Sequence, residues 1–282
     1  MRGWRTALFI LFTGAARALD RAGRASMCLA AATLRRHELR GAIANNWKEF
    51  GRSESAILSG FMPWEQALYE RFLKPRDRIL VVGCGTGRDL IALLKLGYRA
   101  AGLDVPPLAI ARAREMLDRA GLRADLYTGG IEAIALPGRF DVFTFSWCCY
   151  GYIPQSAVRI DVLRKVKAHL NPGGRILISY FAADPPPRAF PVALMRCVAR
   201  ATGSDWLPEP GDVIGAPTDD QGALHYEHKF REGELESEAR AAGLTAVYYE
   251  RGDVEATVLM VDPVEAADAP PSGRSPRRPD DR

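Results

Sequence analysis

The feature that most constrains the fold is the segment ILVVGCGTGRDL at residues 79–90, where four aliphatic residues lead into three closely spaced glycines. A short aliphatic run that ends at a glycine is typical of a buried strand. Gly83, Gly85 and Gly87 remove side chains where the strand would pass into a helix, so the main chain there can adopt positive φ and approach a ligand closely. Open α/β sheets bind ligands at this turn. The segment therefore predicts an α/β sheet with a ligand site at its first strand–helix junction.

The region that follows residue 78 alternates between strand-like and helix-like stretches. The expected strands are 78–83, 100–104, 124–130, 139–147 and 175–181. The expected helices between them are 87–96, 106–121 and 156–170. Strands separated by helices of this length predict βαβ units, in which a parallel sheet is covered by helices on both faces.

A hairpin is expected at the end of this region. A helix at 231–242 precedes two more strands, 246–250 and 256–261, and only residues 251–255 separate those strands. A connection this short cannot hold a crossover, so the two strands are expected to pair antiparallel.

The nature of the ligand is indicated by an acidic residue on the second strand. Asp104 lies 21 positions after Gly83, and an acidic residue there typically binds the hydroxyls of a ribose. The dinucleotide fingerprint GxGxxG requires a third glycine where this chain has Arg88; here the series is GxGxG. The pattern fits a ribose-containing ligand and departs from the NAD fingerprint.

The stretch from about 60 to 261 resembles the class I SAM-dependent methyltransferases of the small-molecule type. The matching motifs are VVGCGTGRDL, AGLDV, RFDVFTFSW and LNPGGRILIS, followed by HYEHKFREGELESEARAAGL. The resemblance implies a Rossmann-like, doubly wound, seven-stranded sheet that is mostly parallel with one antiparallel strand. It also implies S-adenosyl-L-methionine (SAM) as cofactor.

The same resemblance implies which residues contact the cofactor. The glycine turn would face its methionine and ribose parts, Asp104 would bind the ribose hydroxyls and Val105 would lie beside the adenine. Similar sequences often have Gly-Asp-Ala after the third strand where this chain has Gly-Gly-Ile-Glu. Either Glu132 binds the adenine from a shifted position, or main-chain groups near Ile131 do. The full set expected at the cofactor is Gly83, Cys84, Gly85, Thr86, Gly87, Asp104, Val105, Ile131, Glu132 and Ser146.

The acceptor is expected at the segment SWCCYGYIP (146–154), which follows the fourth strand. Trp147, Tyr150 and Tyr152 could form an aromatic wall that binds the substrate, although each could instead pack against a neighbouring helix. The sulfonium methyl is already activated, so transfer needs alignment above all, and a base only when the acceptor arrives protonated. The candidates for a catalytic group are Tyr150, Tyr152 and His228.

Two segments are candidate covers of the site. Residues 182–230 exceed an ordinary connection, and we expect them to form a substrate cap with a short helix around residues 193–198. Aromatic residues ahead of the first strand mark a second candidate: Trp47, Phe50, Phe61 and Trp64. The stretch HYEH at 225–228 matches no zinc signature, so no metal site is expected.

The N-terminal segment is basic. The chain has a net charge of +4, of which residues 1–40 contribute +6, so the remainder carries −2 and gives no electrostatic case for binding nucleic acid. Apolar residues from Trp4 to Ala22 recur at helical spacing, with Arg17 and Arg21 on the opposite side. This pattern fits a helix lying on an anionic membrane surface or an ordinary packed helix about equally well, and a signal peptide ranks third.

The sequence therefore predicts three parts: a basic amphipathic helical segment (1–45), a methyltransferase domain (46–262) with its cap, and a disordered, proline-rich tail (263–282). Five cysteines without a paired spacing indicate a reducing, cytoplasmic location, with peripheral membrane contact as an alternative. The expected reaction is methyl transfer to O or N of a small-molecule or lipid-like acceptor. A nucleotide-dependent oxidoreductase and a non-catalytic SAM-binding scaffold are the rival hypotheses.

Overall fold

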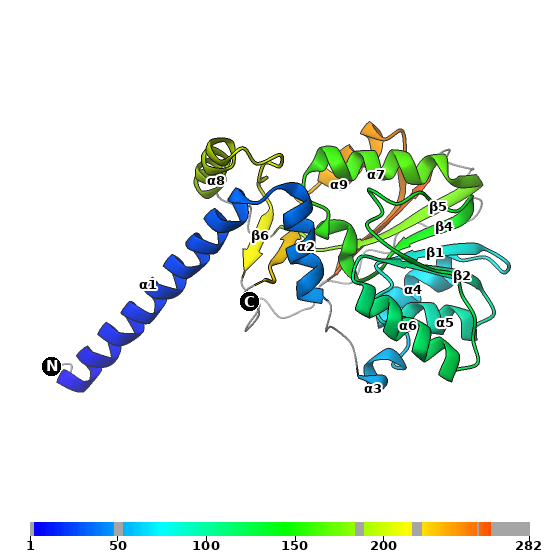
Figure 1. The fold of residues 1–282 in the computed structure, drawn as a ribbon, viewed down its shortest axis with the longest axis horizontal. Coiled ribbons are helices and arrows are strands. Elements are labelled where there is room, and N and C mark those ends of the chain that lie inside the picture. Colours follow the sequence, from blue (N-terminus) through cyan, green and yellow to red (C-terminus); the bar gives the residue numbers. More distant parts are fainter. Residues whose placement is uncertain (1–2, 48–52, 184–188, 216–221, 253, 261–282) are drawn as a thin grey trace, which may run out of the picture.

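The main sheet has seven strands in the order β3-β2-β1-β4-β5-β9-β8 (Figure 1). The computed structural model describes residues 3–47, 53–183, 189–215, 222–252 and 254–260. The strands are β1 (Arg78–Val82), β2 (Arg99–Asp104), β3 (Leu126–Thr128), β4 (Phe140–Phe145), β5 (Leu170–Tyr180), β8 (Thr245–Glu250) and β9 (Glu255–Met260). The first five pair in parallel, whereas β9 is antiparallel to both β5 and β8. The predicted fold class and its closing hairpin are confirmed.

Helices cover both faces of this sheet, because successive side chains of a strand point to opposite faces. In β1, Leu80 and Val82 pack in one apolar core and Ile79 and Val81 in the other. The first core includes residues of α7 (Ser156–Ala168) and α9 (Glu234–Ala241). The second includes residues of α4 (Pro63–Phe72), α5 (Arg88–Lys95) and α6 (Pro107–Arg119). This two-sided arrangement is the doubly wound architecture.

A third apolar core joins the N-terminal helices to the segment between β5 and β9. Its elements are α1 (Trp4–Thr33), α2 (Arg36–Trp47), α8 (Ala189–Thr202) and the two-stranded sheet of β6 (Asp212–Gly215) and β7 (His225–His228). Ala31 of α1, Ile43 of α2 and Met195 of α8 are buried there together with Trp206. Beyond this contact α1 projects away from the rest of the molecule (Figure 1). The predicted N-terminal segment and cap thus share one core.

Some boundaries differ from those expected. The fifth strand begins at Leu170 rather than at Arg175, with a register shift against β4 before the two strands align. The third strand has only three residues. Two further short elements, α3 (Glu54–Ile57) and the 3-10 segment η1 (Ser146–Tyr152), border the site described below. The tail at 263–282 lies outside the described residues.

Candidate functional site

A cavity of about 490 Å³ lies at the carboxyl ends of β1, β2 and β4. This is the edge at which open α/β sheets bind ligands, and the volume is in the range of small-molecule sites. The turn after β1, the end of β2, η1, α2 and residues 53–62 contribute to its wall. The expected site residues that line it are Gly83, Cys84, Gly85, Thr86, Asp104, Val105, Ile131, Ser146, Trp147 and Tyr152.

The three glycines of the turn all have positive φ, but their surroundings differ. A Cβ on Gly83 would lie 2.7 Å from the Cys149 sulfur, so this glycine permits close packing against η1. A Cβ on Gly85 would have only an Asp104 oxygen within reach, at 4.0 Å, because the cavity opens there. Gly87 does not line the cavity; it precedes α5, and a Cβ there would meet Ala113 of α6 at 3.3 Å. Gly87, expected at the cofactor, thus lies behind the cavity wall at the start of α5.

Asp104 ends β2 and is held by the main chain of the two neighbouring turns. The Gly85 amide donates to its Oδ2 at 2.5 Å, and the Val105 amide donates to its Oδ1 at 2.6 Å. Burial raises the pKa of Asp104, and the two amide hydrogen bonds oppose that rise. Each carboxylate oxygen accepts one of these bonds and keeps a second lone pair. The residue is thus fixed at the cavity wall with acceptor capacity to spare.

Glu132 does not line the cavity. Its carboxylate forms an ion pair with Arg40 of α2. The guanidinium of Arg40 lies 2.6 Å from Oε1 and 3.2 Å from Oε2 of Glu132, and it also donates to the Tyr152 carbonyl at 2.8 Å. The neighbouring Ile131 does line the cavity. The contact of Arg40 with Glu132 spans 92 positions in the chain, and no local sequence signal predicted it.

The chain leaves β4 through a strained turn. Trp147 and Cys148 have φ of 48° and 58°, a region that costs about 1–3 kcal/mol for a non-glycine residue and persists where the surroundings enforce it. The preceding Ser146 hydroxyl donates to Asp89 Oδ2 at 2.5 Å. The Arg88 guanidinium lies 5.3 Å from the centre of the Trp147 ring, within cation–π range. The turn therefore holds the Trp147 ring at the cavity wall.

Arg88 also belongs to a buried group of charges beneath that wall. Its guanidinium lies 2.6 Å from Glu65 Oε1 and 2.7 Å from Asp89 Oδ1. Burial, followed by the negative charge of Asp89, raises the pKa of Glu65 to about 7, although Arg88 acts in the opposite direction. The first turn of α5 and the helix α4 are held together by this group. Arg88 and Asp89 line the cavity, although neither belongs to the set of residues expected there.

Two aromatic residues of the cavity wall pack against each other. Tyr152 and Trp47 of α2 have ring centres 4.9 Å apart, and both line the cavity. Burial raises the pKa of Tyr152 well above its ordinary value, so its hydroxyl stays protonated at neutral pH. Trp147 lines the same cavity.

Tyr150 and His228, the other two candidate catalytic residues, do not line the cavity. Tyr150 is fully buried, and its hydroxyl donates to Glu238 at 2.8 Å. His228 is also fully buried, with Nδ1 2.8 Å from Asp212 and Nε2 3.3 Å from Glu234. The expectation that these two residues face the acceptor is not met.

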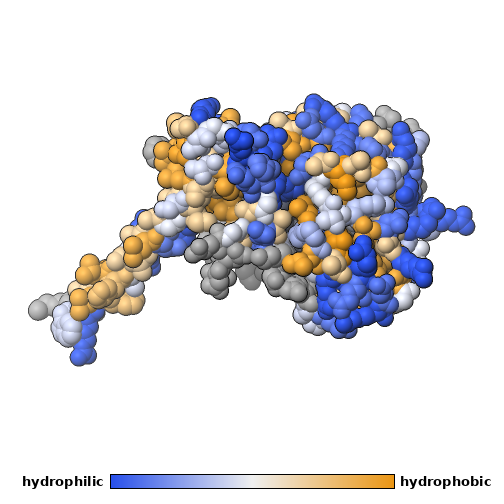
Figure 2. All heavy atoms as spheres, in the orientation of Figure 1, coloured by the Kyte–Doolittle hydropathy of each residue, from blue (hydrophilic) through white to orange (hydrophobic). Residues whose placement is uncertain are grey.

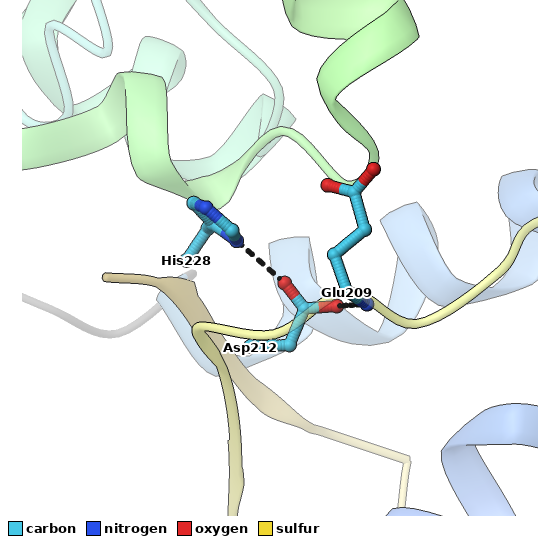
Figure 3. A group of neighbouring side chains, drawn as sticks. All are labelled: Glu209, Asp212 and His228. Carbon is cyan, nitrogen blue, oxygen red and sulfur yellow. Dashed lines mark hydrogen bonds and ion pairs between the residues drawn. The ribbon is translucent and has the colours of Figure 1, made fainter. Parts of the chain in front are cut away.

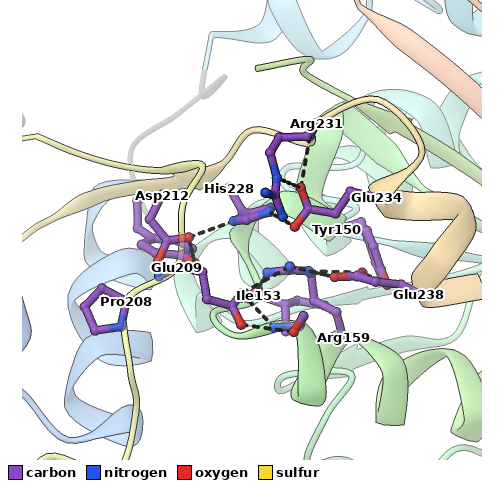
Figure 4. A network of polar contacts seen from close by, with 12 residues as sticks. Tyr150, Ile153, Arg159, Pro208, Glu209, Asp212, His228, Arg231, Glu234 and Glu238 are labelled. Carbon is purple, nitrogen blue, oxygen red and sulfur yellow. Dashed lines mark hydrogen bonds and ion pairs between the residues drawn. The ribbon is translucent and has the colours of Figure 1, made fainter. Parts of the chain in front are cut away.

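His228 lies instead in a network of polar contacts with Asp212 and Glu234 (Figure 4). Glu209, Asp212 and His228 place three ligand-type atoms within 4.8 Å of one another (Figure 3). Each group already has protein partners: Glu209 accepts from the Ser156 amide at 2.8 Å, and Asp212 accepts from the Tyr226 hydroxyl at 2.8 Å. The network therefore joins β6 and β7 to α7 and α9 by hydrogen bonds.

The cover of the cavity also differs from the expectation. Among the described residues, α2 and residues 53–62 line the cavity on the side where a cover was expected. No described residue of 182–230 lines it. Of the aromatic residues ahead of β1, Trp47 lines the cavity, whereas Phe61 packs against Tyr69 with ring centres 4.9 Å apart. Trp64 does not line the cavity, and Phe50 lies outside the described residues.

The fold and this site define a class: Rossmann-like α/β proteins with a small-molecule cavity at the first glycine turn. Residues 79–174 match a family model described as a methyltransferase domain. Ribosomal protein L11 methyltransferase of Thermus thermophilus is 30% identical over 141 residues, which are 49% of this chain and 52% of that protein. A ubiquinone biosynthesis O-methyltransferase of Xanthomonas campestris is 26% identical over 205 residues, which are 72% of this chain and 77% of that protein.

Solved structures agree on the fold. A SAM-dependent methyltransferase from Methanosarcina mazei aligns with a TM-score of 0.54 at 19% identity, over 71% of this chain and 97% of that one. The chain spans about half the length of the first two curated relatives it matches, 52% and 45%. Residues 79–174 thus match the methyltransferase-domain model, and the chain has the fold of the class I SAM-dependent methyltransferases. The resemblance seen in the sequence is confirmed.

Proposed function

We propose that this protein is a SAM-dependent methyltransferase that transfers a methyl group to O or N of a small-molecule or lipid-like acceptor. The observation that carries the proposal is the cavity at the first turn, where the bare main chain of Gly85 meets the carboxylate of Asp104. This combination suits a ligand that presents a ribose and lies flat against the backbone. SAM supplies the activated methyl group, and the chain's own residues bind and align the reactants.

The cofactor would be held mainly by the main chain of the turn and by Asp104. The main chain from Gly83 to Thr86 would face its methionine and ribose parts, and Asp104 would accept hydrogen bonds from the ribose hydroxyls. Val105 and Ile131 would contact the adenine. Glu132 is a weaker candidate for the adenine than main-chain groups near Ile131, since Arg40 already engages both of its oxygens.

The acceptor would lie against the aromatic wall of Trp47, Trp147 and Tyr152. Aromatic walls bind flat apolar rings, acyl chains and desolvated cationic amines, the last worth up to about 2 kcal/mol per contact. The named relatives include both an O-methyltransferase of ubiquinone biosynthesis and a methyltransferase of a ribosomal protein. A partly enclosed, aromatic-lined cavity favours the small-molecule class. Tyr152, protonated at neutral pH, would orient the acceptor as a hydrogen-bond donor rather than remove a proton.

The proposal is tested by calorimetric titration of the full chain with SAM, its demethylated product and NADH. We expect binding of the first two. Asp104→Ala should weaken that binding by about 1.5–3 kcal/mol, or roughly ten- to 150-fold, through loss of hydrogen bonds to a charged acceptor. Asp125→Ala, at an exposed carboxylate outside the cavity, is the matched control. Binding of NADH without SAM, or unchanged affinity in Asp104→Ala, would contradict the assignment.

Turnover is tested separately, with labelled SAM and a fractionated metabolite extract that contains lipids. Label that enters a small or lipid-like product supports the proposed reaction. A protein that binds SAM but labels only polypeptides would instead place the acceptor in the protein class. Binding without any transfer would favour a SAM-binding scaffold.

A further inference from the structure

The N-terminal part of α1 is a helix without a partner in the described structure. Residues 4–26 are all exposed except the half-buried Thr13, whereas Ala31 and Ala32 near its other end are buried against the third core. At 1.5 Å per residue, the exposed part extends for roughly 35 Å. Figure 1 shows it projecting from the body of the molecule.

This exposed part gathers an unusual share of the apolar surface. Of the thirteen large apolar side chains exposed in the described ranges, seven belong to α1: Trp4, Leu8, Phe9, Ile10, Leu11, Phe12 and Leu19. Phe12 is 67% exposed and Leu19 is 74% exposed. In Figure 2 the apolar colouring covers much of the projecting helix. A patch of this extent on a soluble protein marks an interaction surface.

The side of the helix opposite the apolar stripe carries three arginines from residue 17 onward. Arg17, Arg21 and Arg24 recur at spacings of four and three, so they share one side, away from the stripe that contains Leu8 and Leu19. Residues 3–26 contain four arginines and a single acid, Asp20, for a net charge of +3. An apolar stripe backed by arginines is the pattern of helices that lie in an anionic lipid surface.

Burial of this helix in a lipid interface leaves few polar groups unsatisfied. The Thr13 hydroxyl donates to the Phe9 carbonyl at 2.8 Å, and the Ser26 hydroxyl donates to the Ala22 carbonyl at 3.0 Å. A hydroxyl that is hydrogen-bonded to its own helix costs little free energy when it is transferred from water into an apolar environment. No helix of the described ranges is long and apolar enough to cross a membrane, so the pattern fits a helix that lies in the plane of the surface.

A second copy of the chain is a poorer fit for the same face. Two such helices packed through their apolar stripes would leave the arginines on the outer faces, where the second copy offers them no counter-charge. An anionic headgroup layer instead neutralises them. Charge complementarity therefore selects the lipid surface.

We propose that residues 4–26 of α1 bind the surface of an anionic lipid membrane, with the apolar stripe at the acyl boundary and the arginines among the headgroups. The folded body is then held next to the membrane through the third core. The proposal does not depend on the identity of the reaction, because it concerns a surface separate from the cavity.

The test is cosedimentation of the full chain with vesicles of phosphatidylglycerol and phosphatidylcholine, compared with phosphatidylcholine alone. We expect binding to the anionic vesicles that weakens as salt is added. The double variant Leu8→Asp with Phe12→Asp should bind at least tenfold more weakly, since two apolar side chains are removed from the interface. Leu96→Asp, at a leucine on the body that is 66% exposed, should bind as the unaltered protein does.

The charge of the opposite face is tested by Arg17→Gln, Arg21→Gln and Arg24→Gln. Each should weaken binding to anionic vesicles about fivefold, from the interaction of one cation with such a surface. These residues lie outside any core, so thermal melting of the variants should match that of the unaltered protein. Failure of the unaltered protein to bind, or equal binding of the Leu8/Phe12 variant, overturns the proposal. A dimer detected by light scattering and abolished in that variant, without vesicle binding, would instead identify a second copy as the partner.

Discussion

A glycine in the first turn can serve the fold, by adopting positive φ, or the ligand, by leaving space for it. Gly85→Ala distinguishes these two roles, because we expect different effects on stability and on binding. Gly85 has a φ of 54°, and the space that its Cβ would enter is the cavity rather than packed protein. Gly97 provides a matched control, since its φ is 86° and a Cβ there would have no atom within 4 Å. It lies in the turn between α5 and β2, away from the cavity wall.

The magnitudes follow from these surroundings. Both substitutions place an L side chain in the left-handed region, which costs about 1–2 kcal/mol in the free energy of unfolding. Only Gly85→Ala also puts a methyl group where the cofactor would lie. Extra atoms forced into a tight contact cost about 1–3 kcal/mol, so its affinity for SAM should fall roughly five- to 150-fold. Gly97→Ala should bind as the unaltered protein does.

The assay combines urea unfolding without ligand and calorimetric titration with SAM on the same two variants. The expected result is a similar loss of stability in both and a loss of affinity in one. If Gly85→Ala binds SAM as tightly as Gly97→Ala, the cofactor does not lie against Gly85 and the assignment of the turn is refuted. If Gly85→Ala is far less stable than Gly97→Ala, the space next to it is packed, contrary to the structure.

Two further predictions concern the buried polar network. Glu238→Gln should lower the free energy of unfolding by about 3 kcal/mol, because it leaves the fully buried Arg159 without its closest counter-charge. The control Asp161→Asn, in an exposed ion pair, should lower it by less than about 1 kcal/mol. Both are measured by urea titration, and equal losses would contradict the prediction. Burial lowers the pKa of His228, but the hydrogen bonds that its ring donates to the carboxylates of Asp212 and Glu234 outweigh that effect, and the net pKa is raised above its ordinary value. The stabilisation it provides should thus be complete below about pH 6.5 and disappear as the pH rises through the raised pKa; a stability gap between the unaltered protein and His228→Gln that grows with pH would show the opposite sign.

The parts of the site that the sequence predicts are those that local backbone geometry determines. A glycine turn after an aliphatic strand and a carboxylate at the end of the next strand are brought together by the parallel sheet itself, and Gly85 and Asp104 do meet there. The sheet was predictable for the same reason, since each strand and helix carries its own periodicity. The closing hairpin followed from the length of one connection.

The rest of the site depends on geometry that periodicity does not encode. Tyr150 and Tyr152 are two positions apart, yet one is buried against Glu238 and the other lines the cavity. Both tyrosines follow a turn through two left-handed residues, Trp147 and Cys148, which no sequence pattern marks. Arg40 was missed because its partner is distant in the chain, and a lone arginine in a basic segment gives no local signal.

The position of α2 connects the two ends of the molecule. It supplies Arg40 and Trp47 to the cavity wall, and only Leu34 and Arg35 separate it from α1. A connection of two residues leaves little rotational freedom, so whatever fixes the direction of α1 also fixes which way the cavity entrance faces. For an enzyme whose acceptor arrives from a lipid phase, such fixed orientation would convert a three-dimensional search for substrate into one confined to a plane.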